Sequence, residues 1–169
     1  AMIMQGSGLP GLDHAEAIAK LETDVTVILN SGGADLGTGL DTISAKIVAE
    51  VLKLPMDRIT VVSGDTDSCA FDTGAYASSG TFFSGNASLV ATKKLKDLII
   101  KEAALQMEEK EEDLDVRAPG EVYSKATGAV LSYYELVHTA TSGGGRGQPI
   151  AHGSFVTTAS SVPYGAHFA

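Results

Sequence analysis

The sequence predicts an α/β domain, and three observations support that prediction. Residues 25–63 show a strand, a helix and a second strand in succession. A long helix is expected over roughly residues 80–110. A loop of glycine and other small residues precedes each helix. The expected architecture is therefore a strand–helix–strand unit plus a long helix packed on a mixed sheet.

The strand–helix–strand unit has recognisable boundaries. The β-branched run Val25–Asn30 predicts the first strand, and Arg58–Ser63 predicts the second. Between them, residues 41–53 carry apolar side chains at helical spacing, and Asp41 or Thr42 is the expected N-cap. The helix should end before a proline, because proline disfavours helical geometry in the preceding residue. A helix of this length can join two strands of one sheet.

The flanking segments are less regular. Residues 14–21 alternate ambiguously and fit either a short helix or an edge strand. Two short strands are expected at 114–116 and 121–124 around a turn at Ala118–Gly120, followed by a short helix at 133–138 and a flexible connection at 142–147. One face of the long helix should pack on the sheet, and its apolar positions are Val90, Leu95, Leu98, Ile99 and Leu105.

Composition excludes several classes of protein. The net charge is −9 with only 12 Lys and Arg, and no basic run offers a face for nucleic acid. No apolar stretch reaches the roughly 18 residues needed to span a bilayer, and no signal peptide is recognisable. The single cysteine, Cys69, excludes an internal disulfide and a cysteine-cluster metal site. These features favour a cytoplasmic protein.

The ends of the chain suggest a piece of something larger. The chain begins with Met2–Met4, which has the composition of mid-strand, and it stops at Pro163–Ala169, an apolar half-strand that would need a partner. Domain ends are more often polar and frayed.

The two small-residue loops are the strongest functional signal. Residues 32–42 and 73–80 each lead into a helix, where unsatisfied backbone N–H groups bind anions. Two such loops in one domain suggest a phosphate-bearing ligand held at more than one point. The alternatives are a tight strand-to-helix turn at 32–42 and a plain helix cap at 73–80.

Other candidates are weaker. Asp65 and Asp67 could ligate Mg²⁺ or Ca²⁺, but further ligands are missing and an Asx turn explains them better. Cys69 has no activating base beside it. The histidines show no ligand spacing and read as surface or core residues; they are His14, His138, His152 and His167.

Taken in order, the motifs resemble those of the molybdopterin-binding large subunit of the xanthine dehydrogenase and aldehyde oxidoreductase family. Gly37–Thr42 is similar to the family's Gly-Gln-Gly-x-x-Thr loop, with Thr38 in place of glutamine. Val61–Asp67 resembles its Gly-Asp-Thr-Asp turn, and Gly74–Thr81 with Gly85–Ala87 resembles its serine-containing segment. Leu21–Val27 resembles a strand and Asp-Gly turn, but the glycine is missing, which is expected to shorten the turn. The nearest branch includes hydroxybenzoyl-CoA reductase, nicotinate dehydrogenase and purine hydroxylases.

The resemblance implies a molybdenum hydroxylase that acts on an N-heterocycle or an aldehyde. Its cofactor is molybdopterin, in some members in the cytosine dinucleotide form, and [2Fe–2S] clusters and FAD lie on other domains or subunits. Residues 1–169 would be a partial domain, with a cofactor-loop part at 14–110 and short strands with a connection at 111–169. Tyr76 would border the substrate. The implied cofactor-binding residues are Gly37, Thr38, Gly39, Thr42, Ala75, Ala77, Ser78, Ser79 and Gly80.

Two features qualify the implied function. The family's base glutamate would lie beyond Ala169, so no catalytic residue and no metal ligand is expected within the chain. Thr38 removes one side-chain contact to the cofactor. The alternative is a non-catalytic interaction or structural domain on the same scaffold, without a metal cofactor. The substrate, the nucleotide on the pterin, the choice of sulfur or selenium at the metal and the oligomeric state are not fixed by the sequence.

Overall fold

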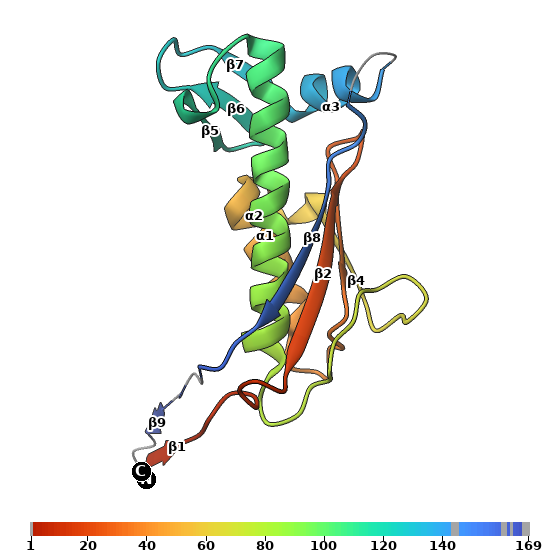
Figure 1. Ribbon diagram of the computed structural model, residues 1–169, viewed down its shortest axis with the longest axis vertical. Coiled ribbons are helices and arrows are strands. Elements are labelled where there is room, and N and C mark those ends of the chain that lie inside the picture. The colour runs from red at the N-terminus through yellow and green to blue at the C-terminus, as the bar shows by residue number, and fades with distance from the viewer. Residues whose placement is uncertain (1, 143–145, 160–161, 163, 167–169) are drawn as a thin grey trace.

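The computed structural model describes residues 2–142, 146–159, 162 and 164–166. Its main sheet has four strands in the order β4–β3–β2–β8. Two helices, α1 and α2, pack against one face of this sheet (Figure 1). The elements are β2 (His14–Leu21), β3 (Val27–Ser31), α1 (Leu40–Leu52), β4 (Ile59–Ser63), α2 (Gly80–Met107) and β8 (Ile150–Val156). The predicted α/β class is confirmed.

The strand–helix–strand unit forms as expected. β3 and β4 are parallel neighbours, with Leu29 opposite Val61, and α1 connects them through a short 3₁₀ turn, η1 (Met56–Arg58). Of the two alternatives for residues 14–21, the strand is confirmed and the helix is wrong. The expected edge position is also wrong, because β2 lies in the interior of the sheet, between β3 and β8. Its buried face is Ala15, Ala17, Ala19 and Leu21.

Strand β8 was not predicted. It pairs antiparallel with β2, with Gly153 opposite Ala17. Glycine is required at 153 because a Cβ there would lie 2.3 Å from the Ala91 nitrogen and 2.6 Å from the Ala87 oxygen. The backbone of α2 therefore runs directly over β8. The inward-facing residues of β8 before Phe155 are small. The sequence therefore shows no hydrophobic alternation there that would have predicted a strand.

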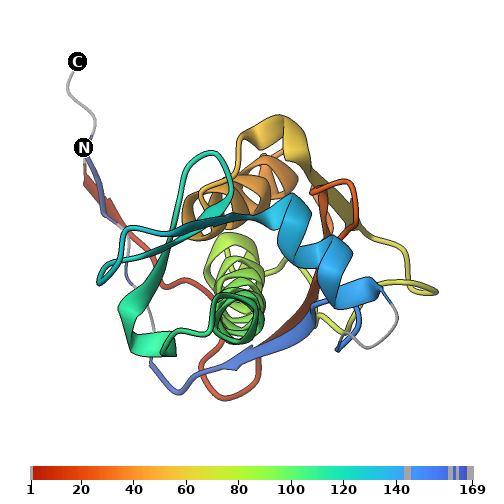
Figure 2. The same ribbon diagram turned by 90° about the horizontal axis from the view of Figure 1, so that it is seen from above.

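The long helix α2 lies at the centre of the molecule, with α1, α3 and the strands around it (Figure 2). Its predicted face was partly wrong. Leu95 and Ile99 are buried, but Leu98 is 38% exposed and Leu105 is 51% exposed. Small residues make up most of the first half of the true face, which lets the helix approach the sheet closely. They are Ser84, Gly85, Ala87, Ser88, Ala91 and Thr92.

One local expectation needs correction. Neither Asp41 nor Thr42 caps α1; the N-cap is Gly39, at φ 80°, and it makes no side-chain cap bond. The turn between β2 and β3 contains no glycine. Val25 takes the left-handed conformation instead, at φ 66°, and its N–H donates to the oxygen of Glu22 over 3.0 Å. This conformation is rare for a β-branched residue.

The remaining elements form two small sheets and a helix. The strands predicted at 114–116 and 121–124 are confirmed as β5 (Leu114–Arg117) and β6 (Glu121–Ser124), after the 3₁₀ turn η2 (Glu111–Asp113). β7 (Val130–Ser132) completes their antiparallel sheet. The helix predicted at 133–138 is α3 (Tyr133–Thr141), which starts with a capping box between Ser132 and Glu135.

The two ends of the described chain pair with each other. β1 (Met2–Met4) runs antiparallel to β9 (Tyr164–Ala166), with Ile3 opposite Gly165. The two terminal apolar segments, β1 and β9, thus pair with each other. The connection expected at 142–147 is described only in part, because residues 143–145 lie outside the described residues. Among the described helices, none has both the length and the hydropathy to cross a bilayer.

Candidate functional site

The two small-residue loops lie at the same end of the sheet, where β3 and β4 end and both helices begin (Figure 1). Leu40, the first residue of α1, sits between them. Its Cδ2 atom lies 2.9 Å from the position of a Cβ at Gly33 and 3.9 Å from that at Gly80. Ligands of open α/β sheets bind beyond the carboxyl ends of the strands, so this end of the domain is the candidate site.

A cleft of about 570 Å³ opens between the loops that follow β3 and β4. None of the predicted cofactor-binding residues lines it, although Gly32 and Ala34 belong to the predicted loop at 32–42, and Asp65 and Cys69 are among the weaker candidates. The lining residues lie in the loops that follow the two parallel strands, which is the signal that could have placed them at the site. They are Gly32, Ala34, Gly64, Asp65, Thr66, Cys69, Ala70, Phe71 and Asp72.

A carboxylate of the chain itself, that of Asp35, binds the N–H groups at the start of α1. The Asp35 carboxylate accepts from the N–H groups of Gly37 and Gly39 over 2.9 and 3.1 Å, and from that of Asp41 over 3.3 Å. Desolvation raises the pKa of Asp35, but these amide bonds outweigh it, so the pKa lies below its usual value. The interpretation of residues 32–42 as a bare helix start was therefore wrong in this structure. Thr38 and Thr42 are exposed beside the loop.

The loop before α2 has an unusual backbone. Ala77 and Ser78 are consecutive non-glycine residues with positive φ, 47° and 57°. Each such residue costs on the order of 1 kcal/mol and persists where its surroundings require it. Ser79 is buried, and its hydroxyl donates to the Gly74 oxygen over 3.0 Å. By contrast, the side chains of Ala75 through Ser78 are exposed.

The N–H groups at the start of α2 precede its hydrogen-bond ladder. The first helical bond runs from the Phe83 nitrogen to the Ser79 oxygen over 2.8 Å. The N–H groups of Gly80, Thr81 and Phe82 are thus the ones that a helix leaves without an internal partner. With the exposed Ser78 hydroxyl beside them, they can bind a phosphate.

Asp72 anchors this loop to the rest of the fold. Its carboxylate accepts from the Gly74 nitrogen over 2.8 Å and from the Ser84 hydroxyl over 2.7 Å. Gly32 is required opposite, because a Cβ there would lie 2.3 Å from the Ala70 oxygen. The cleft wall is therefore a tight contact between the loops that follow β3 and β4.

The segment before β2 contacts the loop before α2, which the sequence did not indicate. The Gly8 nitrogen donates to the Ala77 oxygen over 2.8 Å, and the Gln5 amide donates to the Ser78 hydroxyl. Asp13 lies beneath this segment, fully buried, and its Oδ2 accepts from the Leu9 nitrogen over 2.7 Å. Its Oδ1 has no hydrogen-bond partner within the described part of the chain.

The charge of the site determines which parts of a cofactor it suits. Residues 32–42 and 64–80 contain no Lys or Arg but five aspartates, Asp35, Asp41, Asp65, Asp67 and Asp72. A phosphate fits the start of α2, where amides and a hydroxyl are offered, but not the start of α1 while Asp35 fills it. Acceptor-rich loops suit the N–H groups at the edge of a pterin ring. The residues present fit molybdopterin at one loop and conflict with a phosphate at the other.

The weaker candidates take structural roles. Asp65 forms the expected Asx turn, accepting from the Asp67 nitrogen over 3.0 Å and from the Ser68 hydroxyl over 2.7 Å. The Cys69 thiol contacts the Val62 oxygen at 3.3 Å. His14 and His152 flank Glu16 on the outer face of the sheet, with Nε2–carboxylate distances of 3.2 and 3.1 Å.

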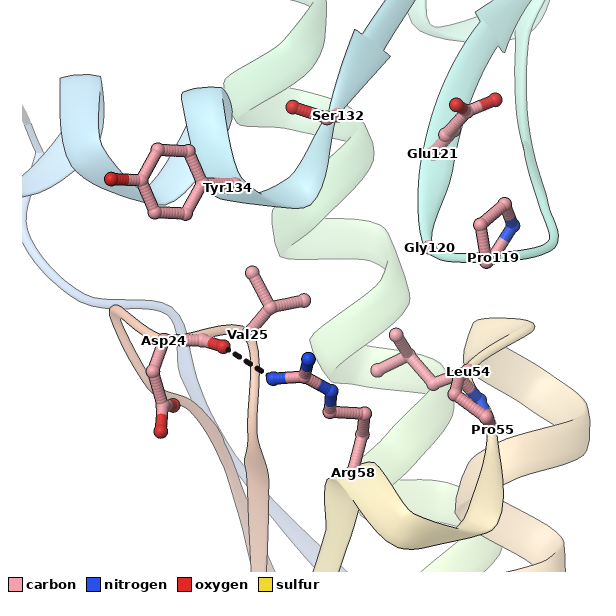
Figure 3. A pocket seen from close by; sticks show the side chains of 10 residues that line it. All are labelled: Asp24, Val25, Leu54, Pro55, Arg58, Pro119, Gly120, Glu121, Ser132 and Tyr134. Atoms are coloured by element: carbon pink, nitrogen blue, oxygen red, sulfur yellow. Dashed lines mark hydrogen bonds between the residues drawn. The ribbon is translucent and has the colours of Figure 1, made fainter.

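A second pocket, of about 410 Å³, lies at the opposite end of β3 (Figure 3). Arg58 projects into it and donates to the main-chain oxygen of Asp24 over 3.1 Å, while the Asp24 carboxylate points away. Leu54, Pro119 and Tyr134 form much of the remaining wall. None of the predicted site residues lies here.

The whole chain, residues 1–169, matches the molybdopterin cofactor-binding domain family, and the chain belongs to that family. It is 46% identical over its full length to the probable hypoxanthine oxidase XdhD of Escherichia coli K12, of which it spans 18%. It is 35% identical over 98 residues, 57% of the chain and 13% of the relative, to the putative xanthine dehydrogenase molybdenum-binding subunit XdhA of the same strain.

Solved structures show the same fold. The quinoline 2-oxidoreductase of Pseudomonas putida 86 superposes with a TM-score of 0.84 at 19% identity, covering 96% of this chain and 23% of that one. The Cu,Mo-CO dehydrogenase superposes with a TM-score of 0.83 at 24% identity, covering 97% and 22%. The predicted family is confirmed. The chain corresponds to a minor part of each of these relatives.

Proposed function

We propose that the chain is part of the cofactor-binding region of a molybdenum hydroxylase subunit. The observation that carries the proposal is the convergence of two small-residue loops and two helix starts at the carboxyl ends of β3 and β4. The cofactor is molybdopterin, with the cytosine dinucleotide as its expected extension. The whole enzyme is an oxidoreductase that hydroxylates an N-heterocycle or an aldehyde, and the 46% identity to a probable hypoxanthine oxidase favours a purine.

When bound, the cofactor supplies two-electron redox chemistry at molybdenum. The residues of this chain bind and orient it. The N–H groups at the start of α2 and the Ser78 hydroxyl hold the phosphate, and the exposed small side chains at Ala75 and Ala77 leave room for the ring. Tyr76, between them, borders the substrate. The general base is a glutamate expected beyond Ala169.

The proposed partners follow from the family. They are the remainder of the molybdenum subunit and subunits or domains carrying [2Fe–2S] clusters and FAD, in the cytoplasm. One relative, at 28% identity over 144 residues, is the gamma subunit of the 6-hydroxypseudooxynicotine dehydrogenase complex of Paenarthrobacter nicotinovorans. A complex of several subunits is consistent with this chain, because its single cysteine cannot supply the four thiolate ligands of a [2Fe–2S] cluster.

One observation favours the alternative, a non-catalytic domain on the same scaffold. The Asp35 carboxylate occupies the start of α1, and Thr38 stands beside it where the resembled loop has glutamine. A domain that has lost its cofactor would keep this loop, because its N–H groups already donate to Asp35. A cofactor-binding domain must either leave the loop unused or displace Asp35.

Two substitutions in the full-length subunit test the proposal. Ala77→Leu adds bulk to an exposed position, so it should lower the molybdenum content per protein severalfold and leave the melting temperature nearly unchanged. Ser79→Ala is the matched control in the same loop. It removes a buried hydroxyl and should lower the stability by about 1 kcal/mol, with a smaller loss of metal. Molybdenum content unaffected by Ala77→Leu, or absent from the wild type expressed with its partners, would favour the alternative.

A further inference from the structure

The segment before β2 is packed against the loop before α2 and against the helix start itself. The Gly8 nitrogen donates to the Ala77 oxygen over 2.8 Å. Gly8 has φ 78°, and a Cβ there would lie 2.2 Å from Cε2 of Phe83, in the first turn of α2. Position 8 therefore requires glycine, because only a residue without a Cβ lets the backbone lie so close to the ring.

The other end of the segment is also held. Oδ2 of the buried Asp13 accepts from the Leu9 nitrogen over 2.7 Å, and the Asp13 nitrogen donates to the Leu9 oxygen over 3.0 Å. The Thr73 nitrogen, where the loop before α2 begins, donates to the His14 oxygen over 3.0 Å. Residues 8–14 are thus bonded to the loop near both of their ends, which fixes the residues just before them beside the loop.

Gln5 extends this contact to a side chain. Its amide nitrogen donates to the hydroxyl oxygen of Ser78, which itself has φ 57°. Among residues 2–142, 146–159, 162 and 164–166, the Ser78 hydroxyl donates to no acceptor. A serine hydroxyl carries one proton and two lone pairs. Because the bond from Gln5 uses a lone pair, the proton of Ser78 remains available to an acceptor from outside the chain.

We propose that Gln5 is a positioning residue of the cofactor site, which orients the Ser78 hydroxyl so that its proton is donated to the cofactor phosphate. The inference rests on the proposed function for the phosphate, but not for the contact between the two side chains. Neither residues 5–13 nor residues 64–80 contain Lys or Arg. A phosphate at the start of α2 therefore relies on neutral donors that are already oriented, and Gln5 fixes one of them.

The direction of the bond determines the expected effect of removing Gln5. An amide that donates to Ser78 leaves the serine proton to the phosphate. An amide turned over by 180° would accept that proton through its oxygen and withhold it from the phosphate. Loss of Gln5 should weaken cofactor binding in the first arrangement and strengthen it in the second.

The test measures the rate of molybdenum release from the full-length protein purified with its cofactor. Gln5→Met keeps the length of the side chain and removes its polar groups, so release should become about three- to tenfold faster, the value of one hydrogen bond. Ser78→Ala should have a similar effect. The double variant should release molybdenum no faster than Ser78→Ala, because both changes remove one interaction. Unchanged or slower release from Gln5→Met, or multiplied effects in the double variant, would overturn the inference.

The melting temperature of the cofactor-free protein separates positioning from a structural role. The bond between Gln5 and Ser78 is exposed, so Gln5→Met should stay within about 2 °C of wild type. The control is Gln106→Met, near the other end of α2. The Gln106 amide donates to the Leu136 oxygen over 3.0 Å and to the Glu102 carboxylate over 2.8 Å. Its loss should lower the melting temperature and leave the release rate within about twofold.

The two proposals fail in different ways. An equal fall in melting temperature for Gln5→Met and Gln106→Met would make Gln5 a structural residue and overturn the inference alone. Molybdenum absent from the wild type, expressed with its partners, would overturn the proposed function and the inference together.

Discussion

The hydroxyl of Ser84 donates to Oδ2 of Asp72 over 2.7 Å, and this bond ties the second turn of α2 to the loop that follows β4. Ser84 is buried, and the same carboxylate also accepts from the Gly74 nitrogen. The arrangement ties the start of the proposed cofactor-binding loop to α2, the helix that follows it.

Ser84→Ala should therefore destabilise the protein by about 1.5–3 kcal/mol, the usual range for a hydrogen bond to a charged group. Ser68→Ala is the control. Ser68 makes a similar bond to Asp65, 2.7 Å long, but in an exposed turn, where water can replace the hydroxyl. Its cost should stay below about 0.5 kcal/mol. Urea unfolding of both variants measures the difference, and equal costs would contradict the anchoring role.

Val25→Gly should stabilise the protein, which is unusual for the removal of a hydrophobic side chain. Val25 has φ 66°, where a side chain with a Cβ costs about 1–2 kcal/mol. Glycine removes that cost, and two terms offset part of the gain: the lost packing of the partly buried side chain against the core, and the greater freedom of glycine in the unfolded chain. A net increase of up to about 0.5 kcal/mol is expected. Thr26→Gly, at the next position and without positive φ, should destabilise instead.

The Asp35 contacts predict a dependence of stability on pH. Its pKa is lower in the folded protein than in the unfolded chain, so its stabilisation is fully present above the ordinary carboxyl value of about 3.9. It is lost as the pH falls through the folded value. The melting temperatures of wild type and Asp35→Asn should thus differ at pH 7 and converge toward pH 3. A difference that does not shrink in acid would show that Asp35 acts through packing.

Two glycines test whether the space around a missing Cβ decides the effect of an alanine substitution. Gly153→Ala would place a Cβ 2.3 Å from the Ala91 nitrogen, so about 3 kcal/mol or more of destabilisation is expected from overpacking. Gly85→Ala is the matched control. It lies inside α2 with its nearest neighbour, Ile47 Cδ1, at 3.5 Å, an ordinary contact. Alanine there should stabilise the helix by up to about 1 kcal/mol.

The same small residues explain what the sequence could and could not predict. The strand–helix–strand unit was predictable because Val27, Leu29 and Val48 are large and periodic. Strand β8 and the true face of α2 were not, because Gly153, Ala87 and Ala91 pack backbone against backbone and give no hydrophobic signal. Large apolar residues such as Leu98 were mistaken for the core. Hydrophobic periodicity detects large apolar side chains, whereas the contact between α2 and β8 requires small ones.

The candidate site was predictable in place but not in detail. Both loops are brought together, as Leu40 between Gly33 and Gly80 shows. The occupation of the α1 start by Asp35 depends on loop geometry, which spacing does not reveal. Gly8 lies far along the chain from Ala77, whose oxygen accepts its N–H, and a single sequence carries no sign of such a long-range contact.

The close seating of α2 on β8 has a consequence for how this domain can diverge. A helix of 28 residues moves as a stiff rod, and its first residue, Gly80, belongs to the proposed cofactor-binding loop. A larger side chain at Gly153, Ala87 or Ala91 would tilt or lift that rod, and its N-terminal end, which lies near these residues, would carry the displacement to the loop. Substitutions at these positions should therefore be accepted in lineages only as compensating pairs, so the proposed cofactor site constrains variation at residues outside it.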